Sequence, residues 1–482
     1  MRAVDVGAVA WWGYVACLAV LGVYAAHRLW LILASWRAGG ARPRAPLALP
    51  EPALPVITVQ LPLYNEAAVA ARLIDAAAAL DWPRDRFEIQ ILDDSTDATS
   101  AVCAARAAAW QAAGVDVVHL RRDDRAGFKA GALARGLASA RGELVLVLDA
   151  DFVPAPTILR AAVGHFADPR VALVQLRWEH LNRGASLLTE VQALLLDGHF
   201  VVEQASRARG GRFFNFNGTA GVWRRAAIVD AGGWQSDTLT EDLDLSYRAL
   251  LRGWRFVYRL DQAVPAELPA DMVAFESQQF RWAKGSVQVA RKLLPAVLRA
   301  PLPWRVKLDA FFHLTQNVPY LVTFGLLFAM VPALLARGAP SPGELAWIHL
   351  PAVVLSALTL ISYCVTSQKA LGRRNILATL ARLPAYVAIT AGISFNQARA
   401  VLEGALGKPS EFVRTPKTGA IGARPVARRC RPTYDRRTIV ELLMAAQLAA
   451  GAAIAVSVGR VAIAVPLALF AAGFAWGRLG RR

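Results

Sequence analysis

Cysteine is scarce in this sequence, and the four cysteines are far apart. Cys17, Cys103, Cys364 and Cys430 show no spacing that is typical of metal ligands. Two of them lie in strongly apolar stretches, where a thiol packs as a small hydrophobic group. We therefore expect neither disulfides nor a structural zinc site. Internal repeats are also lacking, which argues against a repeat architecture.

Charged residues are few, and acidic residues are outnumbered. Of the 482 residues, 19% are charged and 55% are hydrophobic, with a mean hydropathy of +0.35, which predicts a membrane protein. The formal net charge is +18. The basic residues are spread over loops beside apolar segments, where orientation signals and lipid headgroup contacts occur. We therefore expect membrane lipids, and no nucleic acid, as partners.

The first long apolar run covers residues 9–36, enough to cross a hydrocarbon core of ~30 Å. Arg37, Arg42 and Arg44 follow it closely and place the next region in the cytoplasm. A cleaved signal peptide would have an apolar core of only about 7–15 residues. We therefore predict a retained N-terminal transmembrane anchor over residues 1–40.

Apolar runs return in a predicted C-terminal transmembrane region, residues 306–482. Four runs are expected to cross the membrane: residues 310–335, 345–365, 440–458 and 461–476. Residues 376–395 lie between two basic loops, so this segment is interpreted as interfacial or re-entrant. Residues 397–438 carry ten Lys or Arg against three acids and are expected in the cytoplasm. Together with the N-terminal anchor, these four runs predict a multi-pass integral membrane protein with five crossings. Its N-terminus would lie outside and its C-terminus inside.

Between the membrane regions, residues 41–305 alternate short apolar runs with Ala-rich helical segments. The runs rich in β-forming residues are 56–61, 87–92, 115–120, 144–148 and 171–176. This alternation predicts a cytoplasmic α/β domain with a largely parallel sheet.

Aspartates follow two of the predicted strands, with the sequence Asp-Asp-Ser at 93–95 and Asp-Ala-Asp at 149–151. In open α/β sheets, ligands bind outside the carboxyl ends of the strands. Carboxylates placed there can reach Mg²⁺, which usually keeps substrate phosphates and waters as further ligands. Asp151 is the first candidate for a metal ligand, and Asp149 would assist. Helix capping by Asp94 or Ser95 is the alternative interpretation of the first cluster.

Two further motifs lie towards the end of this region. Thr-Glu-Asp at 240–242 precedes a helical stretch and could be only an N-terminal cap. Gln278, Arg281 and Trp282 share one helix face. Arginine can pair with a diphosphate, and an indole can stack on a sugar ring. A packed amphipathic helix is the alternative explanation for such an Arg-Trp pair.

Taken in order, Asp94, Asp149-x-Asp151, the 240–242 motif and Gln278-x-x-Arg281-Trp282 resemble the family 2 glycosyltransferases with a GT-A fold. The likeness is greatest to the branch of cellulose, mannan and hyaluronan synthases, and it covers residues 56–417. It implies a GT-A-type nucleotide-sugar-binding domain embedded in an α-helical transmembrane bundle, with Mg²⁺ or Mn²⁺ as the cofactor.

The resemblance also implies roles for individual residues. Asp242 would be the catalytic base, and Asp151 with Asp149 would bind the metal. The residues implied to contact the donor are Asn65, Glu66, Asp94, Lys129, Asp149 and Arg281. Those implied to contact the acceptor are Asn217, Gly218, Thr219, Glu241, Gln278 and Trp282. Residues 411–417 resemble a gating loop that covers the donor, with Phe412, Thr415 and Lys417 as its members.

The expected reaction is a direct displacement. One carboxylate takes the proton of the acceptor hydroxyl while the sugar C1 is attacked opposite the diphosphate, so an α-linked donor gives a β-linked product. The leaving diphosphate gains negative charge, which a divalent cation and basic groups would meet. We predict an inverting hexosyltransferase that uses UDP-glucose or GDP-mannose and extends a β-linked polysaccharide such as β-1,4-mannan, glucomannan or glucan.

Two alternatives remain beside a polysaccharide product. Transfer of one sugar to a lipid acceptor needs the same membrane and donor chemistry, but Trp282 and the gating-like loop favour a polymer that is held between additions. A nucleotide-sugar-sensing transporter is disfavoured, because the predicted crossings carry few central ionisable residues. The sequence leaves the donor sugar and any accessory subunits open.

Overall fold

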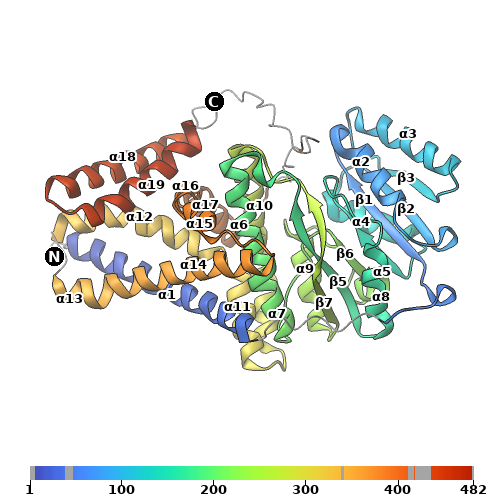
Figure 1. Ribbon diagram of the computed structural model, residues 1–482, viewed down its shortest axis with the longest axis horizontal. Helices are drawn as coiled ribbons and strands as arrows, with labels where there is room; N and C mark the ends of the chain where they lie inside the picture. The colour runs from blue at the N-terminus through green and yellow to red at the C-terminus, as the bar shows by residue number, and fades with distance from the viewer. Residues whose placement is uncertain are drawn as a thin grey trace.

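The computed structural model describes residues 6–37, 47–337, 341–410, 417, 419 and 436–479. A bundle of long helices lies at one end of these residues and an α/β domain at the other (Figure 1). Helices α6 (Leu187–Gly198), α7 (Ala205–Arg209) and α10 (Met272–Arg299) stand where the two parts meet.

The α/β domain contains one sheet of seven strands in the order β3-β2-β1-β4-β6-β5-β7. The strands are β1 (Ile57–Leu63), β2 (Phe87–Asp93), β3 (Val117–Arg121), β4 (Leu144–Val147), β5 (Val171–His180), β6 (Gly221–Arg224) and β7 (Arg255–Ala266). Strands β1 to β4 run parallel, whereas β6 is antiparallel to both of its neighbours. All five strands that the apolar runs predict are present.

Strands β6 and β7 were not predicted, and each has a local reason. β6 is only four residues long. β7 lies at the sheet edge and carries polar residues such as Arg259 and Asp261, so it has no continuous apolar run. Its partner β5 is buried along most of its length and has a continuous apolar run. Of this pair, the sequence therefore predicted β5 and not β7.

The parallel strands are joined by helices α2 (Ala67–Ala78), α3 (Thr99–Ala112) and α4 (Phe128–Ser139). In α2, Val69, Leu73 and Ala77 form one buried face at helical spacing. Burial of a side chain such as Leu73 contributes about 1.5–3 kcal/mol. These crossovers bring the carboxyl ends of β1, β2 and β4 to one edge, since Leu63 pairs with Asp93 and Gln60 with Val147.

The bundle contains α1 (Val6–Arg37), α11 (Trp304–Leu314), α12 (Val318–Arg337), α13 (Pro342–Glu344), α14 (Leu350–Ala370), α15 (Ile376–Ala381), α16 (Leu383–Gly392), α17 (Ser394–Ala405), α18 (Arg436–Ser457) and α19 (Val461–Leu479). Within the described residues, three helical stretches, 8–37, 342–370 and 437–457, are long and apolar enough to cross a membrane. The number rises to as many as five if each of two bent helix pairs is one span.

A bend lies near the end of the predicted interfacial or re-entrant segment, residues 376–395. The axes of 376–392 and 394–405 differ by 44°, which fits a broken span or a re-entrant loop. The run predicted at 310–335 is likewise divided, with a bend of 57° between α11 and the following helix. α16 packs closely against α19, because a Cβ on Gly392 would overlap the carbonyl of Gly473.

Helix α9 (Glu241–Leu251) begins against α10, and Gly285 permits this close approach. A Cβ on Gly285 would lie 2.5 Å from Thr240 Cγ2. We expect Gly285→Ala to destabilise the folded protein by about 1–3 kcal/mol, because this contact becomes overpacked. Thermal unfolding in detergent measures the effect. Gly184→Ala is the matched control, since no atom lies within 4 Å of its added Cβ; equal unfolding temperatures for the two variants would contradict the packing argument.

Candidate active site

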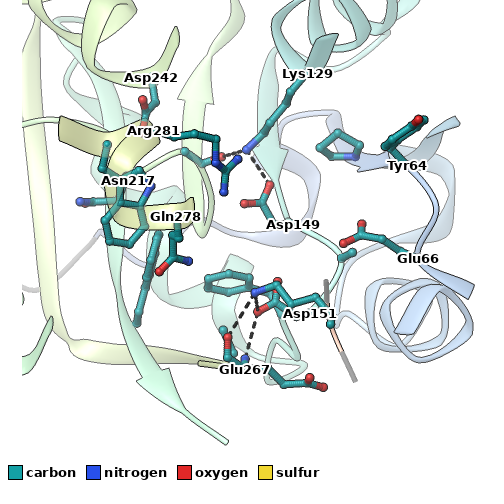
Figure 2. A pocket seen from close by; sticks show the side chains of 18 of the residues that line it. Tyr64, Glu66, Lys129, Asp149, Asp151, Asn217, Asp242, Glu267, Gln278 and Arg281 are labelled. Carbon is teal, nitrogen blue, oxygen red and sulfur yellow. Dashed lines mark hydrogen bonds and ion pairs between the residues drawn. The ribbon is translucent and has the colours of Figure 1, made fainter. Parts of the chain in front are cut away.

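A pocket lies at the carboxyl ends of β1, β2 and β4, and residues of α9 and α10 line it as well. Figure 2 shows its side chains. Most of the predicted site residues line it: Glu66, Asp94, Lys129, Asp149, Asp151, Asn217, Gly218, Glu241, Asp242, Gln278, Arg281, Trp282 and Lys417. Four separate sequence motifs therefore meet in one place.

Two predicted contact residues, Asn65 and Thr219, are described but lie outside this pocket lining. Asn65 adopts a positive φ of 53°, and its Oδ1 accepts a hydrogen bond from the Thr96 backbone at 2.9 Å. Thr219 is fully buried, and its hydroxyl accepts from the Asp149 backbone at 2.8 Å. In this structure both side chains hold the loops that present the site. Phe412 and Thr415 lie outside the described residues.

One end of the pocket combines a carboxylate with aromatic and basic groups. Asp94 accepts two hydrogen bonds from the guanidinium of Arg122, the one from Nε at 2.8 Å. Beside it, the guanidinium carbon of Arg125 lies 3.3 Å from the centroid of the Tyr64 ring. Arg122 and Arg125 were not predicted as site residues. They lie in a loop after β3 that carries two arginines and two aspartates, so its charge gave no signal.

Lys129 lies in the pocket and links residues from three of the predicted motifs. Its Nζ donates to Asp149 Oδ1 at 2.6 Å and to the Gly218 carbonyl at 2.8 Å, and it lies 3.8 Å from Glu241 Oε1. Burial alone would lower the pKa of Lys129, but the charges of Asp149 and Glu241 raise it overall. The amine therefore stays positively charged in the pocket.

Asp242 stands at the N-terminus of α9 with its carboxyl group facing the pocket. Its Oδ1 accepts from the Leu243 backbone at 2.8 Å. A Cβ on Gly218 would lie only 3.2 Å from Asp242 Oδ2, so glycine leaves space beside this oxygen. Removal from water, and then the negative charge of Glu241, raises the pKa of Asp242 to about 7. A carboxylate with this pKa is suited to accept a proton near neutral pH.

The raised pKa gives a pH prediction for any reaction in which Asp242 accepts a proton. Only the ionised carboxylate can do so, so we expect the rate to fall as the pH drops through about 7. Initial rates at saturating substrate, measured in steps across this range, check the expectation. A rate that is flat through the whole interval would contradict it.

Asp151 forms the floor of the site. Only 3% of the residue is exposed, and its Oδ2 accepts from the Glu267 backbone at 3.0 Å and from Lys417 Nζ at 2.7 Å. The Glu267 side chain is itself paired with Arg72 at 2.7 Å. Glu267 lines the pocket but was not predicted, because it follows the edge strand β7 that the sequence did not reveal.

The opposite wall is aromatic. Trp282 of α10 and Trp178 of β5 have ring centroids 6.3 Å apart, and Trp178 is supported by Phe152 and Phe200, each at 5.3 Å. Gln278 and Arg281 point into the pocket from the same face of α10 as Trp282 (Figure 2). The site can thus hold a flat apolar face of a ligand beside charged groups. Trp178 was not predicted, since a tryptophan within a strand is commonly part of a core.

Comparison with known proteins identifies the class. The family described as "Glycosyltransferase like family 2" matches residues 53–285. Among solved structures, the mannosyltransferase PcManGT from Pyrobaculum calidifontis, in complex with GDP-Man and Mn²⁺, is similar in fold, with a TM-score of 0.53 and 22% identity. That similarity covers 75% of this chain and 98% of the other. The GT-A fold predicted from the ordered motifs is confirmed.

Similar sequences narrow the class to a branch. Glucomannan 4-beta-mannosyltransferase 2 of Arabidopsis thaliana is 41% identical over 287 residues, which cover 58% of this chain and 54% of the relative. Probable glucomannan 4-beta-mannosyltransferase 3 of Oryza sativa subsp. japonica is 34% identical over 408 residues, 81% of this chain and 71% of the relative. The chain therefore belongs to glycosyltransferase family 2, in the cellulose-synthase-like branch that contains these proteins. It spans about half the length of the Arabidopsis relative.

Proposed function

We propose that this protein is an inverting mannosyltransferase that extends a β-1,4-linked mannan or glucomannan from GDP-mannose. The observation that carries the proposal is the placement of Asp242, a carboxylate with a raised pKa, in one pocket with the Asp149–Asp151 pair and the Trp178–Trp282 wall. The names of the similar plant proteins favour mannosyl over glucosyl transfer. UDP-glucose is the second donor to test.

In the proposed mechanism, the nucleotide lies between Asp94 and the Tyr64–Arg125 pair, and its diphosphate extends towards Asp149. Arg281 and Lys129 supply positive charge where the leaving diphosphate gains negative charge. Asp242 takes the proton of the acceptor hydroxyl as that oxygen attacks C1 from the opposite side. The bond to the diphosphate breaks in the same step, which inverts the anomeric configuration.

The carboxylates at the end of β4 suit a divalent cation. Asp149 and Asp151 offer hard oxygen donors of the kind that Mg²⁺ and Mn²⁺ bind. Asp149 Oδ1 lies 2.6 Å from Lys129 Nζ, and Asp151 Oδ2 lies 2.7 Å from Lys417 Nζ. One oxygen of each carboxylate is therefore already paired with a positive charge. When bound, a cation would neutralise charge on the diphosphate. We propose Mn²⁺ as the first ion to test, with Mg²⁺ as its alternative.

The aromatic wall supports a polymer as the acceptor. Indole rings stack on the apolar faces of sugars, and two of them beside the base can hold the end of a chain between additions. We further propose that residues 41–305 form the catalytic domain on the cytoplasmic side. The polar face of the pocket would then receive a cytoplasmic donor, while the helices of the bundle lie in the membrane.

The experiment supplies purified, detergent-solubilised protein with Mn²⁺ and radiolabelled GDP-mannose or UDP-glucose in separate reactions. Products are divided into alcohol-insoluble polymer and solvent-extractable lipid. We expect insoluble label from GDP-mannose that a β-1,4-mannanase releases. Label found only in the lipid fraction would instead indicate a glycolipid synthase, and polymer formed only from UDP-glucose would assign a glucan product.

A further inference from the structure

The helical run between β5 and β6 changes its winding next to the pocket. α6 passes into a π-helical turn at His199–Gln204 and then into α7. Residues 200–204 of this turn are all buried. π-helical turns are rare and are frequently found at functional sites. This turn stands between the bundle and the sheet, beside α6 and α7 (Figure 1).

The turn holds the amide of Asn217 from both ends. Gln204 Nε2 donates to Asn217 Oδ1 at 2.8 Å, and Asn217 Nδ2 lies 3.1 Å from His199 Nε2. An amide nitrogen can only donate, so His199 Nε2 must be the acceptor and the ring proton must be on Nδ1. His199 Nδ1 lies 3.4 Å from Glu203 Oε2 and donates a hydrogen bond to this carboxylate oxygen. The network therefore selects one tautomer of His199.

Glu203 is anchored by the helices of the bundle. Only 5% of the residue is exposed. Its Oε1 accepts from the Tyr363 hydroxyl at 3.2 Å and lies 3.3 Å from Arg28 Nε. Arg28 belongs to α1 and Tyr363 to α14, both in stretches that could cross a membrane. The orientation of His199 is thus fixed by contacts from outside the α/β domain.

Among the described residues, these contacts leave the Asn217 side chain with one donor and one acceptor to spare. An amide has two N–H donors and two lone pairs on oxygen, and His199 and Gln204 use one of each. Asn217 lines the pocket, and its neighbour Gly218 lies against the carboxyl group of Asp242. A sugar hydroxyl, which both donates and accepts, matches the free N–H and lone pair.

We propose that His199 is a positioning residue for the acceptor: held by Glu203, it orients the Asn217 amide to bind a hydroxyl of the terminal acceptor sugar. The inference rests on the proposed function and adds His199 and Glu203, which are not among the residues that line the pocket. A misplaced acceptor leaves the activated sugar to water. Loss of His199 therefore changes how the donor is partitioned between polymer and free sugar, and not merely how fast it is used.

The test is a double-mutant cycle with full-length protein, radiolabelled GDP-mannose and Mn²⁺. His199→Leu and Asn217→Ala should each raise the ratio of free mannose to polymer, by about 10- to 100-fold. The double variant should match Asn217→Ala alone, because His199 acts through that amide. His199→Gln, whose amide oxygen can replace Nε2 as acceptor, should restore most of the wild-type ratio.

His199→Asn is the second variant, since its shorter amide keeps the site polar and filled but does not reach Asn217. It should behave as His199→Leu does. His165→Gln is the control, because His165 pairs with Arg259 at 3.1 Å and does not line the pocket. Additive effects in the cycle, or an unchanged ratio in His199→Asn, would overturn the proposal. Absence of any mannosyl transfer by the wild-type protein would instead refute the proposed function.

Discussion

Replacement of Asp242 by Asn is expected to lower the rate of sugar transfer by about 10²- to 10⁴-fold, the usual contribution of a general base. The amide has nearly the same shape but cannot take the acceptor proton. Donor affinity should stay within about twofold, because the residues proposed to surround the diphosphate, Lys129, Asp149 and Arg281, are unchanged. Initial rates and equilibrium binding of GDP-mannose measure the two effects separately.

The thermal stability of the Asp242→Asn variant shows whether its lower transfer rate comes from the lost proton acceptor and not from unfolding. The folded protein raises the pKa of Asp242 to about 7, so it binds that proton more tightly than the unfolded chain does. Stability from this group is full at low pH and is lost as the pH rises through about 7. Asp242→Asn, which cannot ionise, should therefore unfold at or above the wild-type temperature at alkaline pH.

Asp237→Asn is the control for Asp242→Asn. Asp237 lies shortly before α9, and its carboxylate pairs with Lys292 Nζ at 2.8 Å. The Asp237 side chain is largely exposed. Removal of such a pair changes stability by about 0–1 kcal/mol, and transfer should be unaffected. Asp242→Asn turning over at the rate of this control would remove Asp242 from the role of base.

Replacement of Asp151 by Asn is expected to weaken metal-dependent donor binding by at least about tenfold. Asp151 is almost fully buried and keeps its backbone contact with Glu267, so the amide should retain the geometry while losing the charge that attracts a cation. Titration of GDP-mannose with Mn²⁺ and again with a chelator measures the metal-dependent part.

The chelated protein is the internal control for Asp151→Asn. Without the metal, wild type and variant should bind GDP-mannose with similar affinity, because the proposed nucleotide-binding residues Asp94 and Arg125 are unchanged. If the variant in Mn²⁺ binds as tightly as wild type, the assignment of Asp151 as a metal ligand is wrong.

Sequence patterns predicted much of the fold, because apolar runs in buried parallel strands leave a strong signal. The edge strand β7 has no such run, and its absence from the prediction also hid Glu267 at its end. The bends at α11–α12 and α16–α17 change the direction of the chain within apolar stretches, and hydropathy alone does not encode such a change.

The candidate site was predicted where motifs follow strand or helix ends, as for Asp151 and Asp242. Residues that reach the pocket from other elements were missed, among them Arg125 on the β3–α4 loop and Trp178 in β5. Thr219 shows the opposite case. It belongs to a recognisable motif, yet its hydroxyl is buried and holds the Asp149 backbone.

The configuration of the new bond tests the central claim most directly. The proposed single displacement by Asp242 predicts that GDP-α-mannose yields only β-linked mannose, which NMR of the anomeric proton and carbon in the first transfer product would show. An α-linked product would contradict the proposed mechanism. Retention of the anomeric configuration requires two displacements and an enzyme nucleophile, and the mechanism gives that role to no residue.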